Sequence, residues 1–415
     1  MKRLFNSISP STIGDGPGSS CDMNTPNFEK KKLNLDLPVE KVNLHTNENG
    51  KAASPKKPRK QIPVKIPKVI CSDDEFLDDD DGHLNFNVTD VLNKYSLLGY
   101  LGKGTFSRVV KACNIETQQM CALKIIRNTE ECRKAGNVEV EMMKKLRGLD
   151  PKNEKLWIKM LDCFEFNGHI CIAFELTGCS LYDFMKENKF QPFTLSQTRQ
   201  IAYQICQSVR DLHENFIAHT DLKPENICFL SSEASCGIHS TRNASFLHVK
   251  NPTIRIIDFG SSALCYDVAH SEASSYINTT FIQTRNYRCP EVALEIGWSK
   301  ACDVWSIACI IFELYNGFLL FPAESDDDIT DSMQDVLGPM PDVYHSYKSS
   351  LMQQLQKDTV SIKKSRCKPL HKYMKVNNNN HRQLFNLLGN LLKYLPHERL
   401  TLTEALDHPF FALCR

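Results

Sequence analysis

The most constraining feature of this chain is a pair of short polar segments, His-Thr-Asp-Leu-Lys-Pro-Glu-Asn at residues 219–226 and Asp-Phe-Gly at residues 258–260. Two aspartates and one asparagine at this spacing can supply one carboxylate that accepts a hydroxyl proton and two oxygen ligands for Mg²⁺. Phosphoryl transfer needs little further covalent chemistry, because its catalysis consists mostly of positioning and charge neutralisation. The two segments therefore predict a phosphoryl-transfer site.

A glycine turn between two strand-like runs lies upstream of these segments and can bring backbone N–H groups close to phosphate oxygens. The third glycine of the G-x-G-x-x-G pattern is replaced by Ser107. We expect nucleotide binding by the whole turn, which consists of Leu101, Gly102, Lys103, Gly104, Thr105, Phe106, Ser107, Arg108 and Val109.

One strand after that turn, Cys121-Ala122-Leu123-Lys124 places a lysine at the end of an apolar run. A fixed cation there suits the α- and β-phosphates of a nucleotide, and a carboxylate must hold it in place. Glu139, in the helical stretch 133–146, is the preferred partner, and Glu141 is the competing one.

Strand-like runs begin at Tyr95, and amphipathic helical segments follow from about Thr194. This order predicts an α+β fold with a small sheet lobe followed by a larger helical lobe. The 17 cysteines are scattered without a C-x-x-C pair, so we expect reduced thiols rather than a disulfide framework.

Residues 1–94 are expected to form a disordered tail. Residues 1–70 contain only two of the 37 aromatic residues, too few to bury the apolar area that would offset chain entropy. Residues 51–70 carry seven Lys or Arg and no acid, whereas residues 71–81 carry seven Asp or Glu and no base. The cluster Lys56-Lys57-Pro58-Arg59-Lys60 fits either a nuclear import signal or a solvated linker.

The charges of the whole chain balance, with 50 basic against 49 acidic residues, which argues against a general nucleic-acid binder. The N-terminus has no signal-peptide apolar core. The longest apolar region starts at Ser306 and is interrupted by Glu313 and Asn316, so it reads as a buried helix rather than a membrane span. We expect a soluble intracellular protein.

Together these segments resemble the eukaryotic protein kinases over residues 95–411, and within them the LAMMER family of dual-specificity CDC-like kinases. The closer match is carried by HTDLKPEN and by three longer runs: ICIAFELTGCSLYDFMKEN from Ile170, IGWSKACDVWSIACIIFELYNGF from Ile296 and RLTLTEALDHPFF from Arg399. The resemblance implies a bilobal kinase fold, with the N-lobe at about 95–177 and the C-lobe at about 178–411.

The resemblance also implies roles for single residues. Lys124 becomes the nucleotide-phosphate lysine, with Glu139 as its partner. Asp221 becomes the catalytic base, and Lys223 contacts the transferred phosphoryl group.

The implied cofactors are ATP and Mg²⁺. Asn226 and Asp258 would be the metal ligands, and Phe174 occupies the gatekeeper position. The backbone of Glu175 and Thr177, in the following hinge, would bind adenine.

Further implied features are structural. Glu291 should form a buried ion pair with Arg399, and Asp303 should brace the catalytic loop. Thr220 replaces the arginine that reads an activation-loop phosphate in many kinases, as it does in other LAMMER kinases. We therefore expect activity without that phosphate.

The chain departs from the family pattern in two places. The LAMMER motif is degraded at 328–338, where only Met333, Leu337 and Gly338 are kept, and Cys289 replaces an alanine. As in LAMMER kinases, an insertion lies between Asn226 and the Asp-Phe-Gly segment. Its alternating SFLHVK run predicts an added strand pair, with a floppy loop as the alternative.

Arginine-containing substrates need carboxylates on the enzyme. Glu225 stands beside the catalytic loop, and a second acidic cluster fits either substrate recognition or helix capping by Ser325; it consists of Glu324, Asp326, Asp327, Asp328 and Asp331. The resemblance implies Ser/Thr phosphorylation of arginine/serine-rich splicing factors, with lesser tyrosine autophosphorylation. It also implies a monomer in the nucleus and cytoplasm, without membrane or direct nucleic-acid binding.

Three alternatives remain. SR-protein kinases share the H-T-D sequence, although Gly297-Trp298-Ser299 favours the LAMMER family. Phe281, where dual-specificity tyrosine-regulated kinases have tyrosine, excludes their mode of activation. A pseudokinase scaffold is favoured only by Ser107, whose side chain is not needed because backbone amides cradle phosphates.

Overall fold

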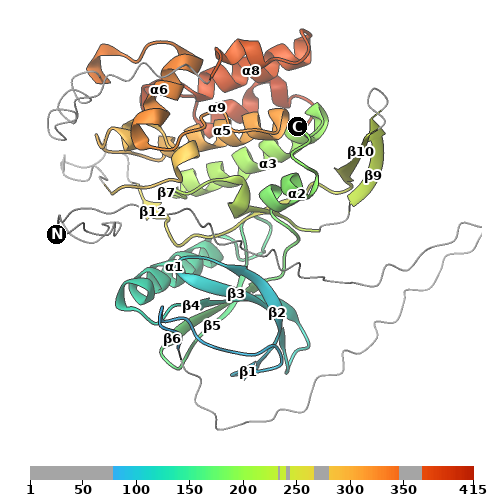
Figure 1. Ribbon diagram of the computed structural model, residues 1–415, viewed down its shortest axis with the longest axis vertical. Coiled ribbons are helices and arrows are strands. Elements are labelled where there is room, and N and C mark those ends of the chain that lie inside the picture. The colour runs from blue at the N-terminus through green and yellow to red at the C-terminus, as the bar shows by residue number, and fades with distance from the viewer. Residues whose placement is uncertain (1–77, 232–233, 240–243, 266–279, 345–366) are drawn as a thin grey trace, which may run out of the picture. The chain divides into compact units, whose positions relative to one another are not determined.

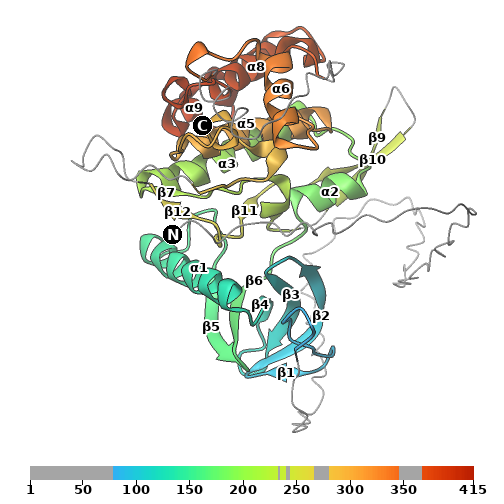
Figure 2. The ribbon, with the colours of Figure 1, turned by 60° about the vertical axis from the view of Figure 1, so that its left-hand side comes forward.

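The computed structural model describes residues 78–231, 234–239, 244–265, 280–344 and 367–415 (Figure 1). A six-stranded antiparallel sheet comes first, in the order β1-β2-β3-β4-β6-β5. Its strands are β1 (Val91–Leu92), β2 (Tyr95–Lys103), β3 (Ser107–Asn114), β4 (Met120–Ile126), β5 (Met160–Phe166) and β6 (His169–Glu175). Helix α1 (Glu130–Leu149) packs against β4, β5 and β6 (Figure 2).

The sheet has two apolar faces because successive side chains on a strand point in opposite directions. Leu123 and Ile125 of β4 join a small core that also contains Leu84 and Leu92. The next residue, Ile126, joins the large core that α1 shares with the helical lobe.

Residues 78–94 belong to this lobe, so their assignment to a disordered tail was wrong. Residues 78–84, called here the N-terminal clasp, lie across the edge of the lobe through polar contacts. Asp79 binds Arg108 at 2.6 Å, and Asp78 binds the buried ring of His169 at 2.7 Å. The basic partners of these carboxylates are distant in the sequence. Burial of the Leu84 side chain also holds the segment against the lobe. The basic cluster at 56–60 lies outside the described residues.

The second lobe is helical. Its helices are α2 (Leu181–Glu187), α3 (Leu195–Glu214), α4 (Pro290–Ala293), α5 (Ala301–Asn316), α6 (Asp326–Leu337), α8 (Asn379–Leu391) and α9 (Leu402–Asp407). The short strand pairs are β7 (Ile217–Ala218) with β12 (Ala263–Leu264), β8 (Ile227–Phe229) with β11 (Ile254–Ile256), and β9 (Ala234–His239) with β10 (Ala244–Val249). Small sheet lobe and helical lobe together give the expected bilobal α+β fold.

The apolar run from Ser306 lies in α5 as far as Asn316; α5 is the central helix of this lobe and is buried from Cys302 to Asn316. It ends at Gly317 with φ of 84°, where an added Cβ would lie 2.1 Å from the Phe190 carbonyl oxygen. Among the described residues, none of the helices has the length and apolarity that crossing a bilayer requires.

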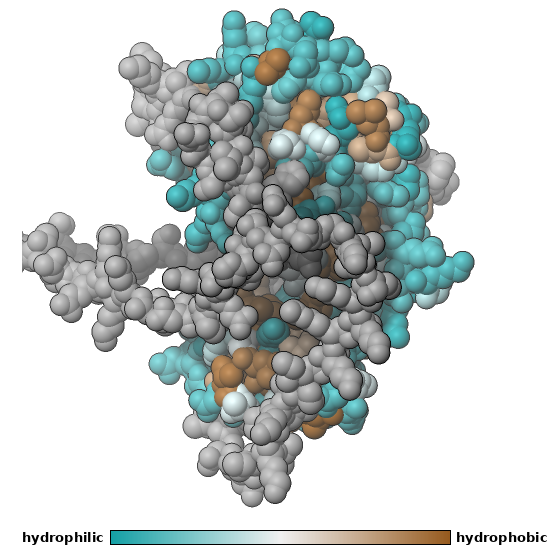
Figure 3. Space-filling view, turned by 90° about the vertical axis from the view of Figure 1, so that its right-hand side faces the viewer, coloured by the Kyte–Doolittle hydropathy of each residue, from teal (hydrophilic) through white to brown (hydrophobic). Residues whose placement is uncertain are grey.

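The predicted strand pair in the insertion is present as the antiparallel hairpin β9–β10. The degraded LAMMER segment is α6, where Ser325 and Asp328 form a capping box and Met333 is fully buried. Of the acidic cluster 324–331, Asp328 therefore has a structural role as part of the helix cap, while the side chains of Asp326 and Asp327 lie outside the described residues. On the face drawn in Figure 3, the described surface is mostly hydrophilic, with hydrophobic atoms in separate patches.

Candidate active site

The loop between β7 and β8 carries Asp221, whose carboxylate is held by its neighbours. Its Oδ2 accepts from Lys223 Nζ at 2.7 Å, and its Oδ1 accepts from Thr284 Oγ1 at 2.8 Å. Asn226 donates to the Asp221 backbone oxygen at 2.8 Å. The short 3₁₀ turn η1 (Pro224–Asn226) makes this contact possible, because it folds Asn226 back over the loop.

Thr284 was missed by the sequence reasoning, which used its segment only to exclude a tyrosine mode of activation. Its hydroxyl also accepts from Lys223 Nζ at 2.9 Å, so it connects the two charged groups. The residue before it, Gln283, is buried with φ of 64°. No local sequence signal places this threonine at Asp221, since 63 residues separate them.

Asp303 at the N-terminal end of α5 braces the same loop, as expected. Its carboxylate accepts from the backbone N–H groups of His219 at 2.8 Å and Thr220 at 2.9 Å, and from the His213 ring at 2.9 Å. Burial acts to raise the pKa of Asp303, but the hydrogen bond and charge of His213 outweigh it and lower the pKa. A charged carboxylate therefore fixes the loop backbone.

Lys124 on β4 lies between two carboxylates. Its Nζ is 2.7 Å from Glu139 Oε1 on α1 and 2.9 Å from Asp258 Oδ1 after β11. Burial lowers the pKa of Lys124, but both carboxylates raise it by more, so the lysine stays charged. Lys124 in turn holds the pKa of Asp258 below its usual value. Glu141 instead pairs with Lys144 on the exposed face of α1, so geometry selects Glu139 over its competitor.

The Asp-Phe-Gly segment is tightly packed behind these groups. Phe259 is fully buried against the His219 ring, with the ring centroids 5.1 Å apart. A Cβ on Gly260 would lie 3.3 Å from Glu139 Oε2, so a larger residue there would push the Glu139 carboxylate. Asp258 has a φ of 64°, a conformation that is uncommon for non-glycine residues but that aspartate adopts more readily than most.

The glycine turn is the hairpin between β2 and β3, closed by a hydrogen bond from Gly104 N–H to the Ser107 oxygen at 2.9 Å. Its tip, Thr105 and Phe106, is exposed. The side chain of Arg108 is not available for the expected nucleotide binding. The alternation along β3 directs its guanidinium to the N-terminal clasp, where it binds Asp79 and the Leu84 oxygen.

In the hinge, Phe174 is buried at the end of β6. The Glu175 N–H already donates to the Lys159 oxygen at 2.9 Å, and its carboxylate binds Arg255 at 3.0 Å. Glu175 can therefore offer adenine only its backbone carbonyl, which leaves Thr177 as the predicted donor.

Two predicted features lie around the site. Arg399 and Glu291 form a buried bidentate pair at 2.6 and 2.7 Å. Glu225 is exposed beside Asp221, on the short turn η1.

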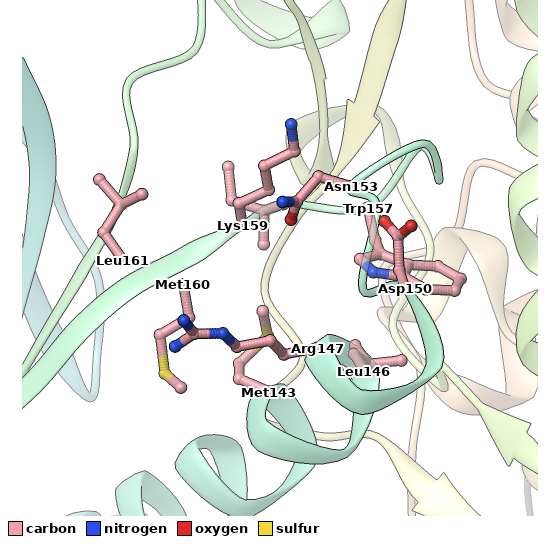
Figure 4. A pocket seen from close by; sticks show the side chains of 10 residues that line it. Met143, Leu146, Arg147, Asp150, Asn153, Trp157, Lys159, Met160 and Leu161 are labelled. Atoms are coloured by element: carbon pink, nitrogen blue, oxygen red, sulfur yellow. The ribbon is translucent and has the colours of Figure 1, made fainter.

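A pocket of about 170 Å³ lies between the end of α1 and β5, lined by Met143, Leu146, Arg147, Asp150, Asn153, Trp157, Ile158, Lys159, Met160 and Leu161 (Figure 4). None of the polar groups around Lys124 or Asp221 lines it. The pocket is therefore separate from the candidate active site.

Comparison with known proteins agrees with this geometry. The model of the protein kinase domain family matches residues 95–411. Mouse dual specificity protein kinase CLK2 is 40% identical over 348 residues, covering 81% of this chain and 68% of that protein. The serine/threonine-protein kinase Doa of Drosophila melanogaster is also 40% identical, over 80% of this chain and 41% of its own length.

A crystal structure of another kinase domain matches with a TM-score of 0.70 and 26% identity, covering 80% of this chain and all of that one. Fold, site geometry and sequence similarity lead to one conclusion. The chain belongs to the protein kinases, within the LAMMER family of CDC-like kinases.

Proposed function

We propose that this kinase transfers the γ-phosphate of ATP, bound with Mg²⁺, to serine and threonine hydroxyls in arginine/serine-rich proteins. The observation that carries the proposal is the arrangement around Asp221. Hydrogen bonds from Lys223 and Thr284 orient its carboxylate, so that it can accept the proton of an incoming hydroxyl. In this proposal, Lys223 contacts the transferred phosphoryl group.

Lys124 would bind the α- and β-phosphates. Glu139 binds the lysine on one side, and on the other side the Asp258 carboxylate lies 2.9 Å from the Lys124 Nζ. Because the lysine is charged and fixed from two sides, it can meet phosphate oxygens without a large entropy cost.

The donor set fits Mg²⁺. Asn226 donates its amide N–H to Asp221, which leaves its amide oxygen as an acceptor, and Asp258 adds a carboxylate. Across the described ranges, no group of three or more His, Cys, Asp or Glu forms a metal cage. A site with only a few protein ligands suits Mg²⁺, because this ion takes most of its coordination from phosphates and water. When bound, the ion would neutralise charge on the phosphates.

Carboxylates near the catalytic loop support an arginine-rich substrate. Burial, with the charge of Glu225 adding to it, raises the pKa of Glu313 to about 7. Glu313 accepts the Tyr287 hydroxyl at 2.6 Å. A guanidinium bound at Glu225 would relieve this repulsion and form charge-assisted hydrogen bonds. Support from the acidic cluster at α6 is weaker, because Asp328 already caps that helix.

The test is a kinase assay with Mg-ATP and two peptides, an arginine/serine repeat and a proline-directed peptide without arginine. We expect phosphorylation of the first, and its loss in Asp221→Asn. Preference for the second peptide would refute the substrate class. Equal signals from both proteins, or none from either, would refute catalysis and favour a scaffold.

We further propose activity without activation-loop phosphorylation. Thr220 is fully buried and donates its hydroxyl to the Ser261 oxygen at 2.7 Å, so no cation stands at this position. The relevant segment, 266–279, lies outside the described residues. Alanine should replace the serines and threonines Ser271, Ser274, Ser275, Thr279 and Thr280. Thr284 is kept because it binds Asp221. Loss of nearly all activity in a folded variant would contradict the proposal.

Nuclear localisation is proposed on the cluster Lys56–Lys60. A fluorescent fusion of the full chain, with these basic residues replaced by alanine, should shift toward the cytoplasm. An unchanged distribution would assign the cluster to a linker.

A further inference from the structure

The tip of the glycine turn is held from the side by Arg127, the residue that follows β4. The Arg127 guanidinium donates to the Thr105 oxygen at 3.0 Å, and the Arg127 backbone N–H donates to the Phe106 oxygen at 2.9 Å. Both carbonyl groups at the tip therefore point toward one residue.

Because these carbonyl groups are fixed, the N–H groups of the same peptide units have fixed directions as well. The described chain contains no cis peptide, and in a trans peptide the C=O and N–H point in opposite directions. With the Thr105 carbonyl on Arg127, the Phe106 N–H points away from Arg127. Among the described contacts this N–H has no acceptor.

The alternation of side chains along β4 shows to which side of the loop the Phe106 N–H points. Lys124 and Ile126 share one face of β4, while Ile125 belongs to the core on the other face. Arg127 is two residues after Ile125, so its side chain points to the same face as that of Ile125. Arg108 pairs with Ile125 across the sheet, and its side chain also turns to the N-terminal clasp. The Phe106 N–H is therefore directed to the side of the loop on which Lys124 lies.

Arg127 is itself held by the N-terminal clasp. Its Nε donates to the Asp81 oxygen at 2.7 Å, and the Asn128 N–H donates to the Gly82 oxygen at 2.8 Å. Gly82 has a φ of 79°, and an added Cβ would lie 3.2 Å from Thr129 Cγ2. The clasp needs glycine at this point to approach the end of β4.

We propose that Arg127 is a positioning residue for ATP. Held by the N-terminal clasp, it keeps the Phe106 amide of the glycine turn directed at the phosphates. The inference rests on the proposed use of ATP and adds the acidic segment 78–84 to the nucleotide site. A hydrogen bond to a charged donor at a partly exposed position is worth enough to change affinity by about three- to tenfold.

The test compares ATP with adenosine, which lacks phosphates. Calorimetry on the full chain should give a dissociation constant for a non-hydrolysable Mg-ATP analogue about fivefold higher in Arg127→Ala and in Gly82→Ala. Adenosine affinity and the KM of the peptide should stay within twofold. Arg133→Ala is the matched control, since its guanidinium binds Gly168, Glu165 and the Asn128 side chain in the same lobe without touching the turn or Arg127.

Equal weakening of ATP analogue and adenosine in Arg127→Ala would assign Arg127 a general structural role and overturn the inference. Unchanged affinity for the analogue would overturn it as well. If the unmodified chain fails to bind the analogue, the proposed function itself fails together with this inference.

Discussion

Replacing Arg399 by lysine tests how a buried guanidinium fixes Glu291 in helix α4. All five N–H groups of Arg399 have acceptors: Nε binds the Lys393 oxygen, Nη1 binds Ala301 and Glu291, and Nη2 binds Tyr394 and Glu291. Arg399 is 5% exposed and Glu291 is 1% exposed, so water cannot replace a lost donor.

The magnitude follows from counting donors. Lysine keeps the charge but has three N–H groups for five acceptors, so two acceptors lose their hydrogen bond to this side chain. Each lost hydrogen bond from this buried charged donor costs about 1–3 kcal/mol, which predicts a loss of roughly 2–6 kcal/mol for Arg399→Lys. Domain stabilities are only about 5–15 kcal/mol, so this is a large fraction. Arg399→Met, which leaves Glu291 unpaired, should lose about 3–5 kcal/mol or fail to fold.

The assay is urea unfolding at neutral pH, followed by tryptophan fluorescence, with Arg415→Lys as the control. Arg415 pairs with Asp407 at 3.4 Å on the surface, so that control should change stability by less than about 0.5 kcal/mol. An equally small change for Arg399→Lys would refute the argument that five buried acceptors require a guanidinium.

Two further predictions follow from buried carboxylates. Glu313, with a pKa of about 7, keeps its proton in the folded chain but loses it near 4.5 when unfolded. The folded state then binds more protons, so stability should fall between pH 4.5 and 7, by at most roughly 3 kcal/mol. Glu313→Gln should remove this fall in urea unfolding at pH 5 and pH 8, and an unchanged difference would contradict the assignment. Gly260→Ala would place a Cβ 3.3 Å from Glu139 and should lower kcat at least about tenfold, whereas a normal kcat would show that the pair with Lys124 tolerates displacement.

Much of the fold was predictable because its signals are local. Strand runs separated by turn residues identified the sheet lobe, and the interrupted apolar run at Ser306 identified a buried helix. The pairing of Glu291 with Arg399 came from family resemblance, since 108 residues separate them and no local pattern joins them.

The acidic run at 71–81 shows where sequence reasoning failed. A block of like charges usually repels itself and stays solvated. Here Asp78 and Asp79 meet His169 and Arg108, which come from strands that the run itself does not predict. Composition cannot reveal such partners, because they are brought together only by the sheet.

The sequence by itself determined the chemistry available to this kinase, because side-chain types at short spacings, such as Asp221 to Asn226, lie on one loop whatever surrounds it. Only the tertiary structure decided which groups work together. It chose Glu139 over Glu141, brought Thr284 to Asp221 and connected the N-terminal clasp to the glycine turn. These contacts join residues distant in the chain, so their geometry depends on packing of the whole sheet and helix framework.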